Sequence, residues 1–189
     1  MLGLGNVLRR DDALGPHVIE NLLAGYEFPS AVTVADLGTP GLNLHPYLAD
    51  CDALIIVDTV RTEGPAGEVH LYRKDDILRH APQPRLSPHD PGLQEALLSL
   101  DFAGQGPREV LLVGVVPEST ASEVGLSATV CRAVPRAEAA VLAELARLGH
   151  AVTRCDPPRQ ANIWWEGAGA EDTGPQARRE AESERADSP

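Results

Sequence analysis

The sequence has few cysteines, and they lie far apart. Cys51, Cys131 and Cys155 make an odd number and contain no CxxC pair. This excludes a disulfide framework and also the zinc or redox pair that closely spaced cysteines form. Such cysteine usage is typical of a reducing compartment, and we therefore expect a cytoplasmic protein.

A long apolar stretch is also missing. No run of about eighteen apolar residues occurs, and the start, MLGLGNVLRRDD, lacks the basic and apolar regions of a signal peptide. We expect no membrane span and no signal peptide. Because only Met1 and Leu2 precede the GLGN motif, we expect the first strand to extend upstream of Met1.

Basic residues are scarce relative to acidic ones. The chain has 16 Lys and Arg against 28 Asp and Glu, which gives a formal net charge of -12. Like charges repel at long range, so this balance argues against nucleic acid or an anionic membrane as a partner. The length of 189 residues and a hydrophobic content of 43% predict one domain with a full core.

Short apolar runs alternate with segments of helical spacing along the chain. Runs rich in Val, Ile and Leu at 32–35, 53–57, 69–72 and 110–116 predict strands. Segments with helical periodicity lie at 18–23, 93–100 and 130–148. This order predicts a single-domain α/β fold with a twisted, mostly parallel sheet and helices on both faces. The segment 69–72 alternates in polarity, which favours an edge position.

The composition changes near Pro157. From there Pro, Gly, Ala, Glu and Arg dominate, and no apolar periodicity offsets the entropy lost on ordering the chain. We predict a folded domain at 1–156 and a disordered C-terminal tail at 157–189. Trp164 and Trp165 are exceptions, suited to packing back onto the domain or to a contact patch.

Polar residues that directly follow apolar strands are the candidates for a functional site, because sites in such folds lie outside the carboxyl ends of the strands. Asp11 and Asp12 end a glycine-containing turn after the first apolar residues, and Asp58 follows the run LIIV. Each acid also has a structural interpretation: Asp11 or Asp12 as the cap of the next helix, and Asp58 as the cap of a loop.

Two further loops carry candidates. His89 and Asp90 lie in the segment LSPHDPG, where flanking prolines restrict the backbone. His89 could be merely solvated, and Asp90 could cap the following helix. The segment 36–41, DLGTPG, suits either a loop that a substrate backbone approaches or a simple turn.

Asp12, Asp58 and His89 together offer two carboxylates and one imidazole. That donor set suits a divalent transition metal such as nickel or zinc. Three protein ligands would leave coordination positions open for substrate or water.

Five motifs, in order between residue 3 and about residue 148, resemble those of the NiFe hydrogenase maturation endopeptidases. They are GLGNVLRRDDALG, DLGTPG, LIIVDTV, LSPHDPGL and LLVGVVPES with EVGLSATV. Five ordered motifs are far more specific than any one of them. The resemblance implies a phosphorylase/hydrolase-like twisted sheet flanked by helices, over a protease domain at 1–156.

The resemblance also implies a function and a site. It implies an endopeptidase, aspartic-type or metal-assisted, that removes the C-terminal extension of a nickel-loaded NiFe hydrogenase large-subunit precursor. Asp12, Asp58 and His89 match the family positions that engage nickel, and we take them as both the metal ligands and the catalytic residues. The nickel is expected to arrive with the substrate, and the protein is expected to act as a monomer.

The sequence departs from the family pattern at two positions within these motifs. Asp12 stands where many relatives carry glutamate, which keeps the charge but shortens the reach by one methylene group. Leu37 replaces a glycine in the DGGT-like loop, where it bears on the geometry of the substrate loop.

Three rival functions remain as alternatives. A dinucleotide-binding domain would use Gly3 and Gly5, but Leu8 occupies the third glycine position of GxGxxG, and the next strand-end acid, Asp36, comes too late. A non-catalytic nickel carrier or chaperone would use the same three ligands only to hold metal. A serine or cysteine hydrolase would need a G-x-S-x-G elbow or a histidine paired with a cysteine, and the sequence shows neither signature.

Overall fold

A six-stranded sheet forms the centre of the molecule. The computed structural model describes residues 1–39, 44–49, 51–80, 83–84 and 93–167. The main strands run in the order β3-β1-β4-β7-β5, and β6 pairs with β4. The strands of this sheet are β1 (Leu2–Leu4), β3 (Ala35–Gly38), β4 (Ala53–Arg61), β5 (Val69–Arg73), β6 (Gln83–Pro84) and β7 (Glu109–Val115).

The four strands from β3 to β7 are parallel, and the edge strand β5 runs antiparallel to β7. The mostly parallel sheet and the edge position of 69–72 are therefore confirmed. The strand predicted at 32–35 is wrong in position: β3 begins at Ala35, because its neighbour β1 begins at Leu2 and Leu2 pairs with Ala35. Residues 32–34 lie beyond that pairing.

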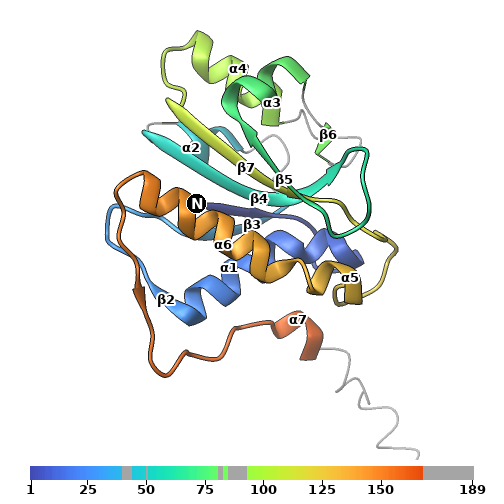
Figure 1. The fold of residues 1–189 in the computed structure, drawn as a ribbon. Coiled ribbons are helices and arrows are strands. Elements are labelled where there is room, and N and C mark those ends of the chain that lie inside the picture. The colour runs from blue at the N-terminus through green and yellow to red at the C-terminus, as the bar shows by residue number, and fades with distance from the viewer. Residues whose placement is uncertain (40–43, 50, 81–82, 85–92, 168–189) are drawn as a thin grey trace, which may run out of the picture.

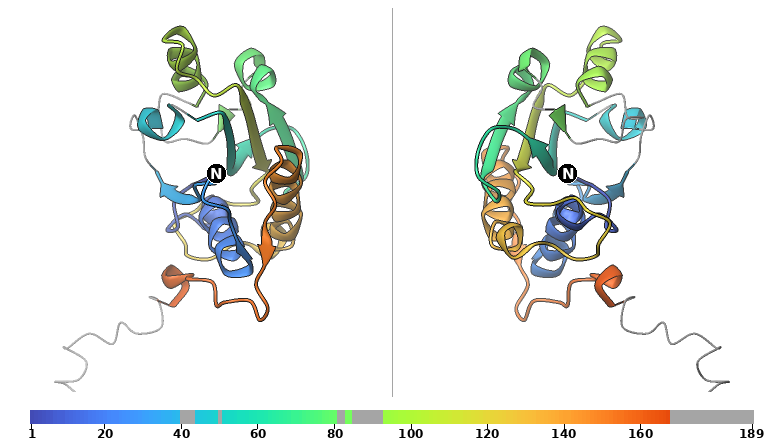
Figure 2. Two further views of the ribbon diagram at one scale, coloured as in Figure 1. Left: turned by 90° about the vertical axis from the view of Figure 1, so that its left-hand side faces the viewer. Right: turned by 90° about the vertical axis from the view of Figure 1, so that its right-hand side faces the viewer.

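Helices cover both faces of the sheet (Figures 1 and 2). One apolar cluster joins α1 and α6 to the side chains of Ile55, Val57 and Val113, and the other joins α4 to Ile56 and Leu112. The helices are η1 (Arg10–Ala13), α1 (Leu14–Gly25), α2 (His45–Leu48), α3 (Lys74–His80), α4 (Leu93–Phe102), α5 (Ala128–Cys131), α6 (Val134–Arg147) and α7 (Trp164–Gly167).

The helical periodicity at 130–148 divides into two helices. Pro135 lies in the first turn of α6, where its missing N–H costs nothing, whereas in the middle of one long helix it would remove a hydrogen bond. No helix in the described part of the chain is long and apolar enough to cross a membrane.

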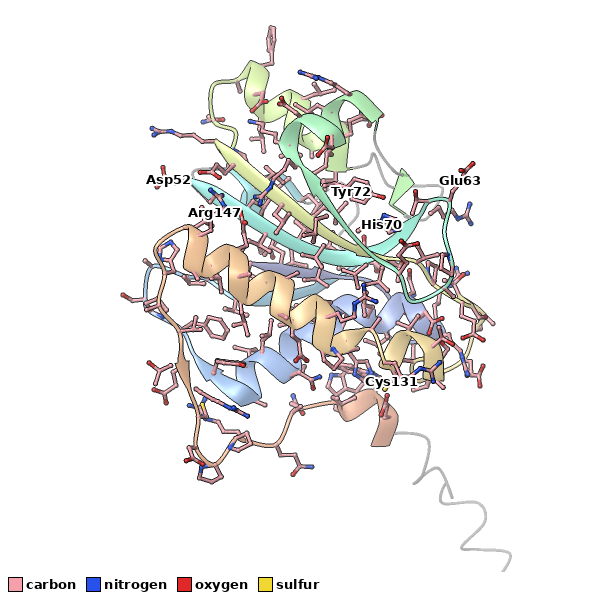
Figure 3. All side chains as sticks on the ribbon, in the orientation of Figure 1. Asp52, Glu63, His70, Tyr72, Cys131 and Arg147 are labelled. Carbon is pink, nitrogen blue, oxygen red and sulfur yellow. The ribbon has the colours of Figure 1, made fainter. Side chains whose placement is uncertain are left out.

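A buried ion cluster ties α6 to the sheet. The side chain of Glu144 is 5% exposed and accepts hydrogen bonds from both Arg73 on β5 and Arg147. These hydrogen bonds lower the pKa of Glu144 to about 2. Arg147 also contacts Glu109 at the start of β7. Figure 3 shows Arg147 beneath the amino end of the strands, near Asp52.

The chain after α6 runs back along α1. The short strand β8 (Thr153–Arg154) pairs antiparallel with β2 (Tyr26–Glu27), and the backbone N–H of Arg159 donates to the carbonyl of Ala24. Trp165 in α7 is 2% exposed. It meets the ring of His17 on α1 edge to face, at 5.3 Å between centroids. The part of the predicted tail up to residue 167 therefore packs on the domain, and 168–189 lie outside the described residues.

Candidate functional site

Glycines allow the turn after β1 to fold tightly against the start of α1. Gly5 has φ +137°, and a Cβ there would lie 1.8 Å from the carbonyl oxygen of Asp12. At Gly15 a Cβ would lie 2.2 Å from the carbonyl oxygen of Leu4 and 2.6 Å from that of Val57. Any larger residue at these positions would push α1 away from β1 and β4. The glycines of GLGNVLRRDDALG thus bring Asp12 to the end of the sheet.

Asp12 lies in η1 and is 9% exposed. Its Oδ2 accepts a hydrogen bond from the backbone N–H of Asn6 at 3.2 Å, and its Oδ1 accepts one from the hydroxyl of Thr59 at 3.3 Å. Burial raises the pKa of Asp12, and these two hydrogen bonds and Arg9 only partly oppose that effect. Neither Asp11 nor Asp12 caps α1, because the N-cap is Ala13 and makes no side-chain cap hydrogen bond. The capping interpretation is therefore wrong.

Asp58 lies inside β4, not after it. The sequence predicts a strand that ends at Val57, but β4 continues to Arg61 because β7 pairs with it as far as Thr59. Asp58 nevertheless stands level with Leu4, the last residue of β1, because Gly3 pairs with Val57. The neighbouring strand β1 therefore ends at the level of Asp58, although Asp58 is itself only 2% exposed.

Thr59 joins the two carboxylates. Its hydroxyl donates to Asp12, and its backbone N–H donates to Oδ1 of Asp58 at 2.7 Å. Two acids separated by 46 positions in the sequence thus both form hydrogen bonds with one fully buried threonine. Sequence reasoning selected both acids but not Thr59, whose place directly after Asp58 in LIIVDTV was the available signal.

His89 and Asp90 lie outside the described residues, so the third member of the predicted trio stays a prediction. Among the described residues no group of three or more His, Cys, Asp and Glu side chains is arranged to hold a metal ion. Asp12 and Asp58 could supply carboxylate oxygens to a metal, and a further ligand would have to come from His89 or from the substrate.

A second acid of the first motif has a different environment. Asp11 is fully buried, and its carboxylate accepts backbone hydrogen bonds from Glu118 and Ser119 at 2.9 Å and from Ser127 at 2.6 Å. All three donors belong to the loop 117–127 that follows β7. Sequence reasoning considered Asp11 only as a helix cap and missed this role.

An open groove of about 640 Å³ continues the line of β4 past Asp58. Val60 lines it two residues later and faces the same side of the sheet as Asp58, because side chains alternate along a strand. Figure 3 shows Glu63, another lining residue, beyond the carboxyl end of β4. The groove is lined by Val60, Arg61, Thr62, Glu63, Val116 and Pro117.

The candidate loop 36–41 is described only as far as residue 39. Gly38 has φ +56° and donates its N–H to the side chain of Asp36 at 2.8 Å, and its carbonyl accepts from the N–H of Gly5. Leu37 packs against the apolar cluster on the α4 side. The loop thus begins beside the turn that carries Asp12, and residues 40–43 lie outside the described residues.

Comparison with known proteins gives consistent matches. A family model described as hydrogenase maturation protease matches residues 16–144. The chain is 36% identical, over 149 residues, to hydrogenase 2 maturation protease of Escherichia coli K12, covering 79% of this chain and 91% of that protein. It is 37% identical to hydrogenase expression/formation protein HoxM of Azotobacter vinelandii, covering 62% of this chain and 57% of the relative.

Solved structures agree with these sequence matches. The hydrogenase maturating endopeptidase HybD from Escherichia coli superposes with a TM-score of 0.76 at 34% identity, over 82% of this chain and 96% of that one. The [NiFe] hydrogenase maturation protease HybD from Thermococcus kodakarensis superposes with a TM-score of 0.59 at 23% identity, over 77% and 96%, which supports the fold alone.

Proposed function

The chain belongs to the hydrogenase maturation protease family, and from this premise we propose that this peptidase removes the C-terminal extension of a nickel-loaded NiFe hydrogenase large-subunit precursor. The observation that carries the proposal is the pair of buried carboxylates, Asp12 and Asp58, joined through Thr59 where β1 ends. The groove that begins at Val60, two residues after Asp58 on β4, offers a place for an extended precursor segment.

Two mechanisms use this geometry. In the first, Asp12, Asp58 and His89 would hold the nickel carried by the precursor, and the ion would supply Lewis-acid polarisation of the scissile carbonyl or of a water molecule. In the second, a carboxylate acts as general base: water adds to the scissile carbonyl carbon and its proton passes to the carboxylate. That proton then moves to the leaving nitrogen as the C–N bond breaks. Burial raises the pKa of Asp12, which makes its carboxylate a stronger base than that of an ordinary aspartate.

In this proposal, recognition of nickel on the substrate is linked to cleavage of the peptide bond. The proposed ligands Asp12, Asp58 and His89 are three, and three protein ligands leave coordination positions open for an ion that brings other ligands with it. A precursor without nickel would then lack the contact that places the scissile bond. The alternative, a non-catalytic nickel carrier, is not favoured, because the relatives with names that state an activity are proteases or endopeptidases.

Cleavage of a purified large-subunit precursor, with and without nickel, tests the proposal by mass spectrometry of the released extension. We expect shortening only of the nickel-loaded form. Shortening of both forms would show that cleavage does not require nickel, and the proposed peptidase activity would still stand. No shortening of either form, together with tight nickel binding by the isolated protein, would favour the carrier.

We also propose that the protein works in the cytoplasm as a monomer. Size-exclusion chromatography with light scattering, and fractionation of the source cells, would test these two expectations independently of the cleavage assay.

A further inference from the structure

The three residues before Asp12 all bind the loop 117–127. The guanidinium group of Arg9 donates to the carbonyl of Thr120 at 3.1 and 3.3 Å. The N–H of Arg10 donates to the carbonyl of Glu123 at 2.6 Å, and the two side chains form an ion pair. Through these contacts and those of Asp11, a segment more than 100 residues away holds the turn that carries the candidate catalytic acid.

Asp11 is the centre of this attachment. Its carboxylate accepts three backbone N–H groups, and its own N–H donates to the carbonyl of Ser119 at 3.1 Å. It is fully buried, so these hydrogen bonds replace the water that a carboxylate would otherwise bind. Ser127 is also the N-cap of α5, so Asp11 fixes both ends of the loop.

The backbone of the turn needs such an attachment. Arg10, directly before Asp11, has φ +46°, a conformation that residues other than glycine rarely adopt. The loop on the other side begins at Pro117, which lines the groove beyond Asp58. One buried carboxylate therefore connects the wall of the groove to the turn that presents Asp12.

We propose that Asp11 is a positioning residue for cleavage: by binding three N–H groups of the loop 117–127, it holds the Asp12 carboxylate in a fixed place relative to the groove. The inference rests on the proposed function, since it assumes that Asp12 acts on a substrate in that groove. Asp11 itself is fully buried and acts through Asp12, without contact with substrate or metal.

The chemistry of the contacts makes the proposal testable by substitution. The carboxylate of Asp11 accepts from three backbone N–H groups. The side-chain N–H₂ group of an asparagine at this position would therefore face at least one of these N–H donors, and two donors cannot form a hydrogen bond. Asp12 differs, because one of its partners is a hydroxyl that can reverse its role and accept from an asparagine. Asp11→Asn should therefore disturb the structure of the site, whereas Asp12→Asn should remove a charge and leave the site in place.

The experiment compares Asp11→Asn with Glu144→Gln, which removes another buried, multiply bonded carboxylate at the opposite end of the sheet. Hydrogen exchange by mass spectrometry is followed in 6–13 and 117–127, and kcat and KM are measured on nickel-loaded precursor. For Asp11→Asn we expect faster exchange in both segments and a fall in kcat of about 10- to 100-fold, the size that a small misplacement of a reacting group causes. Glu144→Gln should lower thermal stability without either effect.

A second pair of variants approaches the contact from the loop, in case Asp11→Asn does not fold. Ser127 has φ -62° and ψ 153°, which proline can adopt. Ser127→Pro removes the N–H that Asp11 binds, and Ser127→Ala removes only the hydroxyl that caps α5. We expect Ser127→Pro, compared with Ser127→Ala, to reproduce the faster exchange in 6–13 and the loss of kcat.

Unchanged exchange in 6–13 in both Asp11→Asn and Ser127→Pro would overturn the proposal, and so would faster exchange with an undiminished kcat. If the wild-type protein cuts no precursor, the proposed function fails by itself. The exchange of 6–13 then still decides whether Asp11 holds the turn of Asp12.

Discussion

At the scale of single residues, Asp12 and Asp58 are the acids on which the proposed chemistry depends. We expect Asp12→Asn and Asp58→Asn each to abolish processing of nickel-loaded precursor. Both residues are buried, with exposures of 9% and 2%, although residues that follow strands are expected at the open edge of the sheet. Burial raises the pKa of Asp12, so its charge costs stability at neutral pH, and Asp12→Asn should keep or slightly raise the melting temperature.

Asp101→Asn is the matched control for these variants. It makes the same chemical change at the end of α4, where Asp101 forms an ion pair with Lys74. The control should cut precursor at the wild-type rate. Full cleavage by either site variant would remove that acid from the mechanism.

The residue scale also shows where prediction from sequence stops. Strand ends identified Asp12 and Asp58, because carboxyl ends of parallel strands share one edge of a sheet. The same argument could not separate Asp11 from Asp12, since neighbours in a 3₁₀ turn point in different directions and only the tertiary contacts decide which one meets the loop 117–127. His89 remains a prediction.

At the scale of elements, the C-terminal segment can be divided by truncation. Deleting 168–189 should leave the melting temperature and cleavage unchanged, since that composition lacks any apolar periodicity. Deleting everything after Pro158 also removes Trp165 and the contact of Glu166 with His17 at 2.9 Å. Loss of a buried tryptophan costs about 3–5 kcal/mol, so the longer deletion should lower the melting temperature by several degrees, measured by calorimetry.

The longer deletion tests the role of α7 as well as its stability contribution. A tail that is disordered from residue 157, as the sequence predicts, would leave processing unchanged after a cut at Pro158. We expect the same result for a reaction run well below the melting temperature. Equal melting temperatures for the two truncated chains would show that Trp165 contributes nothing to the fold. Trp165→Ala in the full chain separates loss of packing from loss of chain length.

The cluster around Glu144 gives a prediction for pH. The pKa of Glu144 is lowered from 4.5 to about 2 in the folded protein. A lowered pKa means that the folded state favours the charged form, so the stabilisation is present above about pH 4.5 and is lost as the pH falls through about 2. We expect Glu144→Gln to lower the free energy of unfolding by about 2–3 kcal/mol at pH 7.

Denaturant unfolding at a series of pH values measures this effect. The difference between wild type and Glu144→Gln should shrink below about pH 4.5 and vanish near pH 2. Glu95→Gln, at an exposed position of α4, is the control and should differ from wild type by less than about 0.5 kcal/mol at any pH. A pH-independent difference for Glu144→Gln would mean that its charge is not the cause.

At the scale of the whole molecule, the sequence predicted the layers better than their connections. Continuous apolar runs marked β4 and β7, and helical periodicity marked α1, α4 and α6, because burial on one or both faces leaves a period in the sequence. The pair of β2 and β8 has two residues in each strand and left no such period. Its place depends on contacts between segments more than 100 residues apart, which no local pattern records.

Net charge is a property of the whole chain and gives the last prediction. A formal net charge of -12 makes the folded molecule repel itself, because folding brings like charges closer than they are in the unfolded chain. Exposed ion pairs such as Arg159–Glu27 contribute little and are screened by salt. The Glu144 cluster is buried at its centre and is screened much less. Salt should therefore weaken the repulsion among the excess negative charges more than it weakens the attraction within the Glu144 cluster.

We accordingly expect the melting temperature at pH 7 to rise between about 10 mM and 300 mM sodium chloride, over which the screening length falls from about 30 Å to less than 10 Å. Potassium chloride should give the same rise, because screening depends on ionic strength and not on the identity of the cation. A fall in melting temperature would mean that the surface ion pairs outweigh the net repulsion. In that case the acidic charges would have to be arranged beside Lys and Arg far more often than the net charge suggests.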